Sequence, residues 1–335
     1  MKILAISDLF VPGDVMRQAL APLRPERLDV VQWQNRDRSE LHQRVRRIER
    51  DGPDVVPPPD EMWGLAEQAD LIVTHLCPLG TEVIRRATNL RMIGVCCGGI
   101  GTIACQAAEA RGIPIYNVPG RNAVAVAEFT SGLMLAERRN IARAHHAIAT
   151  GQWRKEFLNV DHDTQLSGKI VGLVGFGEIG KLVAQRLAPF GAELLVYDPF
   201  QSQQSIAEFG GQSVGLDELL VRSDVVSLHV RRDEHEAPLI GERELALMKP
   251  TSQLINTARA YLVDQDALIV ALQNQRLGGA ALDVFSEEPL DDDSPLRTLD
   301  NITLTPHLAG STREAFHRAP FLLVERIRRE IGTAG

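Results

Sequence analysis

One stretch constrains the fold of this chain more than any other, because it combines two apolar runs, a glycine-rich turn and a helix at fixed spacing. The apolar run Lys169–Val174 leads into the pattern Gly-x-Gly-x-x-Gly at residues 175 to 180, and apolar residues at helical spacing follow. A second apolar run ends in Asp198, 18 residues after Gly180. This order of strand, turn, helix, strand and acid predicts the dinucleotide-binding turn of a doubly wound α/β domain.

Each part of this turn has an expected role. Gly175 permits the tight turn, Gly177 lets a pyrophosphate approach the backbone, and Gly180 lets the helix pack closely on the strand. The helix N-terminus supplies free N–H groups and a positive dipole end. Asp198 can accept hydrogen bonds from both ribose hydroxyls of the adenosine, and its charge would repel a 2′-phosphate. We therefore predict NAD as the cofactor, with a glycine turn that serves packing alone as the alternative.

Length and composition limit the kind of protein. The 335 residues are enough for two domains, and 44% hydrophobic with 24% charged residues is normal for a globular protein. The formal net charge of −8 favours neither a nucleic acid nor an anionic membrane as partner. The N-terminus turns polar too early for a signal peptide, and no apolar run has the length of a membrane span. We therefore expect a cytoplasmic protein.

The cysteines show none of the repeated spacings of a zinc site, so we predict no metal. Small buried or loop residues are the favoured interpretation, and a metal or redox role for the cluster is the alternative. The four are Cys77, Cys96, Cys97 and Cys105.

Short apolar runs alternate with helical or loop stretches along most of the chain. Such alternation indicates parallel sheets with helices on both faces. We predict an α/β fold with two Rossmann-like, doubly wound parallel-sheet domains and a cleft between them. A helical pattern runs from Ala123 to about Gly151. The predicted strands include Ile3–Ile6, Leu28–Val31, Leu71–Thr74, Met92–Val95, Ile113–Asn117, Glu193–Tyr197, Val225–His229, Gln253–Thr257, Ala280–Val284 and Ile302–Leu304.

Three polar residues follow strands of the second domain, at the sheet edge where ligands of Rossmann-type folds bind. Hydride exchange between a nicotinamide and a carbonyl needs a cation that anchors the substrate, a proton donor, and a group that holds the donor. Arg259, Glu288 and His307 offer these three groups. Taken singly, each is also consistent with a surface charge, a loop residue or a structural histidine.

Together these motifs resemble the D-isomer-specific 2-hydroxyacid dehydrogenases, a family that includes phosphoglycerate dehydrogenase and the glyoxylate and hydroxypyruvate reductases. The resemblance runs from about residue 70 to about residue 320 and implies an NAD-dependent oxidoreductase that interconverts a D-2-hydroxy acid and a 2-keto acid. We expect the additional C-terminal regulatory domain of some phosphoglycerate dehydrogenases to be lacking, because the sequence stops near residue 335. The motifs are Gly175–Gly180 with Asp198, Asn256–Arg259, Leu282–Pro289 and Thr305–Ser311.

The resemblance also implies residue roles. Arg259 would bind the substrate carboxylate and carbonyl, His307 would act as acid and base, and Glu288 would hold the second imidazole nitrogen. The loop of Cys97, Gly98 and Gly99 would offer N–H groups to the substrate carboxylate. His75, at the end of a first-domain strand, is expected to line the substrate pocket. The implied cofactor-binding residues are Gly175, Gly177, Glu178, Ile179, Gly180, Asp198, Thr257, Ala258, Arg259, Asp283, His307 and Gly310.

In this family the substrate-binding domain is split. We therefore expect residues 1–118, completed by a C-terminal helix within 308–335, to bind a small 2-keto or 2-hydroxy acid. An NAD-binding Rossmann domain, residues 119–307, would be inserted between them. Members are commonly homodimers through the nucleotide domain, with the helix near residues 122–150 contributing, so we expect a homodimer.

Some positions depart from the family pattern, and other functions stay open. Thr102 and Ala104 stand where acidic or amide residues are usual, and Ala260 stands where glycine is usual. The main alternative is an NAD(H)-sensing binding module, like the corepressors that resemble this family and can retain the same residues. A formate dehydrogenase type is disfavoured because that branch carries Gln at the position of Glu288. The sequence does not identify which 2-hydroxy acid would be used.

Overall fold

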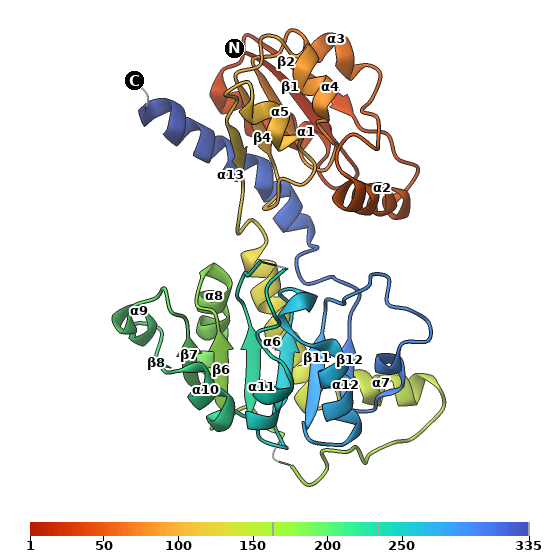
Figure 1. Ribbon diagram of the computed structural model, residues 1–335, viewed down its shortest axis with the longest axis vertical. Helices are drawn as coiled ribbons and strands as arrows, with labels where there is room; N and C mark the ends of the chain where they lie inside the picture. Colours follow the sequence, from red (N-terminus) through yellow and green to blue (C-terminus); the bar gives the residue numbers. More distant parts are fainter. Residues whose placement is uncertain (163, 234, 334–335) are drawn as a thin grey trace. The chain divides into compact units, whose positions relative to one another are not determined.

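The computed structural model describes residues 1–162, 164–233 and 235–333, with side chains as far as Glu330. The chain divides into two compact units. Unit 1 comprises Met1–Asn122 together with the segment that begins at Thr312, and unit 2 comprises Ala123–Ser311. Each unit is built on one parallel sheet (Figure 1), which confirms the predicted fold class of two α/β domains with parallel sheets.

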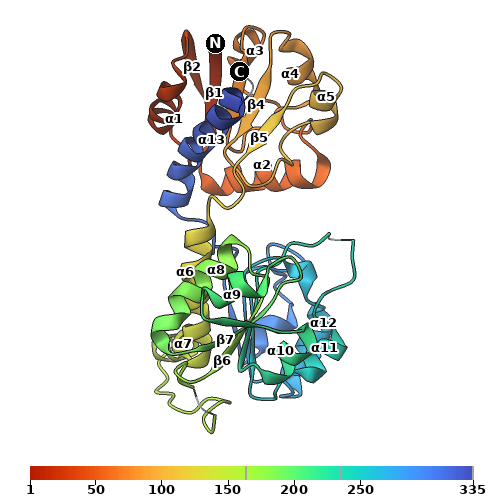
Figure 2. The ribbon, with the colours of Figure 1, turned by 90° about the vertical axis from the view of Figure 1, so that its left-hand side faces the viewer.

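Unit 1 has a five-stranded sheet in the order β2-β1-β3-β4-β5, with every pairing parallel. Helix α13 returns to pack on this unit (Figure 2), and Gly94 of β4 makes room for it, because a Cβ there would lie 2.8 Å from Leu323 of α13. The elements are β1 (Lys2–Ser7), α1 (Gly13–Leu20), η1 (Ala21–Leu23), β2 (Arg27–Gln32), α2 (Arg38–Asp51), α3 (Met62–Ala66), β3 (Leu71–Thr74), α4 (Thr81–Arg86), β4 (Met92–Val95), α5 (Cys105–Glu109), β5 (Ile115–Asn117) and α13 (Arg313–Thr333).

Unit 2 has a seven-stranded parallel sheet in the order β12-β11-β10-β9-β6-β7-β8. The strand order reverses between β6 and β9, the place where open α/β sheets bind ligands. The elements are α6 (Ala123–Arg138), α7 (Ile141–Ala149), β6 (Ile170–Val174), α8 (Glu178–Leu187), η2 (Ala188–Phe190), β7 (Glu193–Tyr197), α9 (Gln203–Ala207), β8 (Gly211–Ser213), α10 (Leu216–Arg222), β9 (Val225–Leu228), α11 (Glu242–Leu247), β10 (Gln253–Asn256), η3 (Ala260–Leu262), α12 (Gln265–Gln273), β11 (Gly279–Leu282), η4 (Pro295–Thr298) and β12 (Ile302–Leu304).

Most predicted strands are confirmed, several with the same bounds, because buried parallel strands form nearly continuous apolar runs. The prediction of one helix from Ala123 to about Gly151 is wrong. The helix breaks after Arg138, and Asn140 takes a left-handed conformation with φ of 55° before α7 begins. Asparagine is one of the few residues that tolerates this region, so the residue type allows the break.

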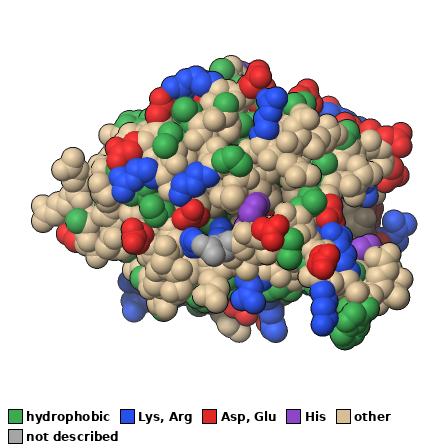
Figure 3. Space-filling view, turned by 90° about the horizontal axis from the view of Figure 1, so that it is seen from below, with side chains coloured by type: hydrophobic (Ala, Val, Ile, Leu, Met, Phe, Trp, Pro, Cys, Tyr) green, Lys and Arg blue, Asp and Glu red, His purple; other side chains and the backbone are tan. Residues whose placement is uncertain are grey.

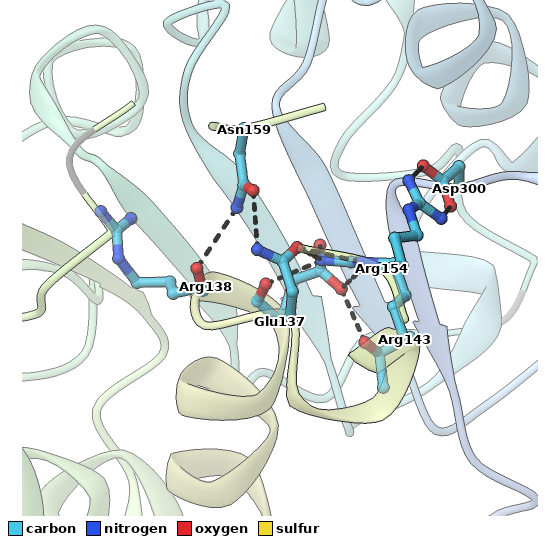
Figure 4. Close-up of polar contacts among 8 residues, drawn as sticks. Glu137, Arg138, Arg143, Arg154, Asn159 and Asp300 are labelled. Atoms are coloured by element: carbon cyan, nitrogen blue, oxygen red, sulfur yellow. Dashed lines mark hydrogen bonds and ion pairs between the residues drawn. The ribbon is translucent and has the colours of Figure 1, made fainter. Parts of the chain in front are cut away.

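A buried polar network holds the chain at this break (Figure 4). The Glu137 carboxylate is fully buried and lies 2.9 Å from Nη1 of Arg143, and the Thr303 hydroxyl of β12 donates to it at 2.7 Å. Asn140 donates to Asn159 at 2.8 Å, which fastens the segment after α7. Burial raises the pKa of Glu137 above its ordinary value although Arg143 opposes the shift. A straight helix would not bring these groups together, so tertiary contacts decide the break.

Candidate active site

The glycine turn after β6 has the geometry that a dinucleotide requires. Gly175 has a φ of +96°, and a Cβ there would lie 2.7 Å from the His229 backbone, so no other residue fits without strain. A Cβ at Gly180 would collide with the Gly175 carbonyl oxygen. Because Gly180 has no side chain, the start of α8 can pack directly against the turn. At Gly177 a Cβ would meet nothing within 4 Å, so the backbone at the helix N-terminus is open to an approaching group.

Helix α8 begins at Glu178, and Gly177 is its N-cap without a side-chain hydrogen bond. The first N–H groups of such a helix, with its dipole, form a site for a diphosphate. Asp198 follows β7 and accepts hydrogen bonds from the Phe176 N–H at 2.7 Å and the Phe200 N–H at 2.8 Å. Each carboxylate oxygen has a second lone pair, so Asp198 keeps capacity for ribose hydroxyls. These residues fit a dinucleotide such as NAD.

The loop after β10 presents Arg259. Asn256 fixes this loop, because its side chain donates to the Arg259 carbonyl at 2.8 Å and accepts from the Ala258 N–H at 3.0 Å. Thr257 is buried and shares a hydrogen bond of 2.7 Å with Thr130 of α6. The Arg259 side chain is exposed, and its Nη1 donates to the neighbouring Ala258 carbonyl at 2.7 Å. The guanidinium therefore has donors left for a substrate.

Asp283 follows β11 and is completely buried. Its carboxylate accepts hydrogen bonds from the Thr305 hydroxyl at 2.6 Å, the Leu308 N–H at 2.9 Å and the Ala309 N–H at 2.8 Å. These bonds fix the loop that carries His307. Asp283 is one of the cofactor-binding residues that the resemblance implies, and within the protein it fixes the position of His307.

His307 and Glu288 form a hydrogen-bonded pair, with 2.9 Å between Nδ1 and Oε2. The second carboxylate oxygen of Glu288 accepts from the Phe285 N–H at 3.1 Å, which orients the carboxylate. His307 has a φ of +54°, a conformation that costs energy for a residue with a Cβ and is found where function requires it. The His307 side chain is 51% exposed, so its other nitrogen can reach a ligand.

The charges around His307 favour its protonated form. The hydrogen bond to Glu288 raises the pKa of His307 above its ordinary value, burial opposes this, and the charges of Glu288 and Asp283 add to the rise. The positive charge of Arg259 acts in the opposite direction. The structure thus brings Arg259, Glu288 and His307 into one electrostatic neighbourhood, on loops that follow the adjacent strands β10, β11 and β12.

The expected substrate residues lie in unit 1. Cys97, Gly98 and Gly99 follow β4, and their loop is held by the Val118 N–H donating to Cys97 at 2.8 Å and the Asn117 amide donating to Gly98 at 2.7 Å. His75 follows β3 and is completely buried, with its Nδ1 2.9 Å from Oδ2 of Asp8. Asp8 was not among the residues predicted from the sequence, although an acid directly after the first strand is a signal that could have pointed to it.

In the described ranges, no helix is at once long and apolar enough to cross a membrane. The same residues include no group of three or more His, Cys, Asp and Glu that could hold a metal ion.

Comparisons with known proteins identify the family of this chain. Residues 131–309 match the NAD-binding domain of the D-isomer specific 2-hydroxyacid dehydrogenases. The chain is 38% identical to a D-3-phosphoglycerate dehydrogenase of Archaeoglobus fulgidus over 77% of its own length and 48% of that protein. It is 37% identical to a hydroxypyruvate reductase of Thermotoga maritima over 82% of this chain and 88% of that protein.

Among solved structures, a D-lactate dehydrogenase from Sporolactobacillus sp. is similar with a TM-score of 0.77 and 26% identity, covering 100% of this chain and 97% of the other. The chain spans about half the length of the D-3-phosphoglycerate dehydrogenases that it matches. The family match covers more than half of the chain and includes both the glycine turn and His307. The chain belongs to the D-isomer specific 2-hydroxyacid dehydrogenase family, and it contains an NAD-binding domain of that family.

Proposed function

We propose that this chain is an NAD-dependent dehydrogenase that interconverts a D-2-hydroxy acid and a 2-keto acid. The observation that carries the proposal is the His307–Glu288 pair beside Arg259, on the loops of three adjacent strands. A cation, a proton donor and a group that orients the donor are the functions that carbonyl reduction needs from the protein. The hydroxypyruvate reductase and D-lactate dehydrogenase among the similar proteins support this class of substrate.

Each residue would have a separate task. The guanidinium of Arg259 would bind the substrate carboxylate and carbonyl oxygen through its planar fork of donors. Glu288 would hold the Nδ1 proton of His307, which leaves Nε2 to give a proton to the ketone oxygen during reduction and to accept it during oxidation. Asp283 would keep His307 in place through the loop contacts that begin at Thr305.

The cofactor would be held by Gly175, Gly177, Glu178, Ile179, Gly180, Asp198, Thr257, Ala258, Asp283 and Gly310. Bound NAD would supply the hydride acceptor, and NADH the hydride donor. The open backbone at Gly177 and the helix N-terminus of α8 support this assignment on structural grounds. Residues 1–118 with the C-terminal helix are proposed to bind the acid substrate through the loop of Cys97, Gly98 and Gly99. His75 was also expected to line the pocket, but it is completely buried, so it would support this loop rather than contact the substrate.

The direct test follows NADH oxidation by absorbance against a panel of 2-keto acids of graded size and charge. The panel runs from glyoxylate and pyruvate through hydroxypyruvate to branched, aromatic and phosphorylated acids. Turnover of one class is the expected result and identifies the substrate class. Folded protein that binds NADH but reduces no member of the panel would contradict the proposal and favour an NAD(H)-sensing role.

We also propose a homodimer through the face that contains α7 and the segment after it. Ile141 and Ile148 of α7 and Trp153 of the following segment are 56%, 55% and 81% exposed, which is unusual for large apolar side chains close together in sequence. Light scattering should give twice 36.9 kDa for the wild type and a lower mass for Ile148→Glu. Val221→Glu, at a position of α10 that is 50% exposed, is the matched control and should stay dimeric.

A cytoplasmic location and the lack of a nucleic-acid partner stay predictions. On the face in Figure 3, acidic and basic side chains of the described residues are interspersed, a distribution that does not favour a polyanion.

A further inference from the structure

Three chemically active side chains meet at one edge of the unit 1 sheet. Asp8 follows β1, His75 follows β3 and Cys97 lies just beyond the end of β4, and these strands are neighbours in the order β1-β3-β4. Because parallel strands end at the same edge, residues far apart in the chain come together there. The Asp8 carboxylate lies 2.9 Å from Nδ1 of His75, and Sγ of Cys97 lies 3.4 Å from the carbonyl oxygen of His75.

The imidazole of His75 is buried, and both its aromatic neighbours and Asp8 fix its position. Its side chain is 0% exposed, and its Nε2 is buried without a hydrogen-bond partner in the described part of the chain. Phe10 and Phe316 enclose the ring, with centroids 6.4 Å and 5.6 Å from it. Asp8 is fixed in turn, because its Oδ1 accepts from the Phe10 N–H at 2.8 Å and the Val11 N–H at 2.9 Å. A polar atom left unpaired in so enclosed a place indicates a function.

The surrounding charges favour an imidazolium next to a thiolate. Burial would lower the pKa of His75, but the negative charges of Cys97 and Asp8 outweigh it and raise the pKa to about 9. Burial likewise would raise the pKa of Cys97, but the charges of His75 and Arg121 hold it below its ordinary value. His75, Arg121 and Asp8 are the charged groups that act on the Cys97 sulfur, and Asp8 alone opposes the thiolate.

The other cysteines lack this environment. Cys77 and Cys96 are buried, and burial raises the pKa of both thiols. Cys105 is partly exposed like Cys97, but burial still raises its pKa and no cation faces it in the described residues. Cys105 is therefore a built-in control for a partly exposed thiol without an ion pair.

We propose that Asp8, His75 and Cys97 form a second reactive site, in which Cys97 is a thiolate nucleophile that hydroperoxides oxidise. The thiolate sulfur attacks one peroxide oxygen, so an S–O bond forms and the O–O bond breaks. Sulfur loses two electrons and becomes a sulfenic acid, while the peroxide is reduced and leaves as hydroxide or alkoxide. The positive charge of His75 stabilises the thiolate before the reaction, and Asp8 holds the imidazolium in place.

Oxidation would also affect the proposed enzyme. Among the described residues the N–H groups of Gly98 and Gly99 donate no hydrogen bond, so they are available to a carboxylate. A sulfenic acid on the preceding residue would place a larger polar group in that loop and stop substrate binding. This consequence rests on the proposed function, whereas the reactivity of the thiol does not.

The first experiment measures alkylation by iodoacetamide from pH 5.5 to 9, with each of the four cysteines followed by mass spectrometry. An ordinary thiol loses about tenfold in rate for each pH unit below its pKa, because only the thiolate reacts. Cys105 should follow this slope. Cys97 should react at least about tenfold faster than Cys105 at pH 6, and its rate should level off at a lower pH than that of Cys105. Parallel slopes for the two cysteines, or an unlabelled Cys97, would overturn the proposal.

Two variants separate the ion pair from simple exposure. Asp8→Asn keeps an oxygen for the Phe10 and Val11 N–H groups but removes the charge that holds the imidazolium. His75→Asn keeps a donor near the position of Nδ1 and removes Nε2. Each variant should give Cys97 the pH slope of Cys105, and an unchanged Cys97 profile in folded variants would contradict the assignment. If both variants fail to fold, the comparison of Cys97 with Cys105 in the wild type still decides.

The second experiment exposes the wild type to hydrogen peroxide and captures sulfenic acid with dimedone. Dimedone should mark Cys97 at pH 6 to 7 and leave Cys77, Cys96 and Cys105 unmarked. Oxidation elsewhere, or none at all at peroxide concentrations that oxidise free cysteine, would overturn the proposal. Neither readout needs turnover, so a protein inactive towards every 2-keto acid would contradict the proposed function and leave this result standing.

Discussion

Among the residues that the structure describes, two histidine–carboxylate pairs have the same nitrogen–oxygen distance in opposite surroundings. His307 and Glu288 in unit 2, like His75 and Asp8 in unit 1, have 2.9 Å between Nδ1 and a carboxylate oxygen. The side chains of the first pair are 51% and 30% exposed, and those of the second pair are 0% and 1% exposed. Both pairs lie where neighbouring parallel strands end.

Burial decides what each pair can do. The exposed pair can exchange its proton with a substrate because one imidazole nitrogen stays accessible. The buried pair cannot exchange protons freely with solvent, so its charge serves the neighbouring Cys97. Burial also increases the loss of folding stability when one partner is removed, because an isolated buried charge is energetically unfavourable.

The largest expected effect is on turnover. His307→Gln should lower the rate of 2-keto acid reduction by about 10²–10⁴-fold, the usual contribution of a general acid, because the proton donor is lost. NADH binding, measured by fluorescence titration, should stay within about twofold of the wild type. His145→Gln, at an exposed histidine of α7, is the control. If His307→Gln stays active, His307 is not the proton donor, and the exposed pair would have no role in catalysis.

The next effect concerns the stability of unit 1. Asp8→Asn should cost about 3–5 kcal/mol, because it leaves a buried imidazole without its counter-charge. The pKa of Asp8 is lowered, since His75 and the loop N–H groups outweigh burial. Its contribution is therefore present above pH 3.8 and is lost as the pH falls through the lower, folded pKa.

Urea unfolding followed by tryptophan fluorescence measures the loss of stability in unit 1. Trp33 is 1% exposed in unit 1, whereas Trp153 of unit 2 is 81% exposed and should change little. A loss below about 1 kcal/mol at pH 7 would mean that the buried pair behaves like a surface pair.

A smaller effect is expected on the pH dependence of catalysis. Reduction needs protonated His307, so its rate should fall as the pH rises through a pKa that lies above the ordinary 6.5. Glu288→Gln removes the main cause of the raised pKa, so the fall should occur at lower pH. The rate below that pH should drop by roughly 10–100-fold, the value of a charged hydrogen bond. A pH–rate profile that is unchanged in Glu288→Gln would show that the pair does not set the protonation of His307.

The smallest effect is on the stability of unit 2. Glu288→Gln should change the free energy of unfolding by less than about 1 kcal/mol, because solvent screens a half-exposed pair. Hydrogen exchange of α8 and α12, read by mass spectrometry, reports on unit 2 alone. A loss as large as that of Asp8→Asn in unit 1 would break the contrast between the two pairs.

Much of the fold and part of the site were predictable from local sequence. Buried strands such as Leu71–Thr74 and the glycine turn at residues 175–180 are recognisable from a few consecutive residues, without knowledge of distant contacts. Arg259, Glu288 and His307 could be singled out because each follows a strand. The positions of β8 and α9 were not predicted, since both elements are short and only weakly apolar.

The chain by itself determined the parallel α/β class, the nucleotide turn and the polar residues at the strand ends, because these follow from local spacing and backbone conformation. Only the tertiary structure decided the helix break at Asn140, where buried Glu137 must meet Arg143 and Thr303. It also decided that Asp8 lies against His75, 67 residues away in the chain. The physical reason is the same in both cases. A buried charge needs a partner, and the tertiary arrangement, which sequence spacing does not encode, determines which partner it finds.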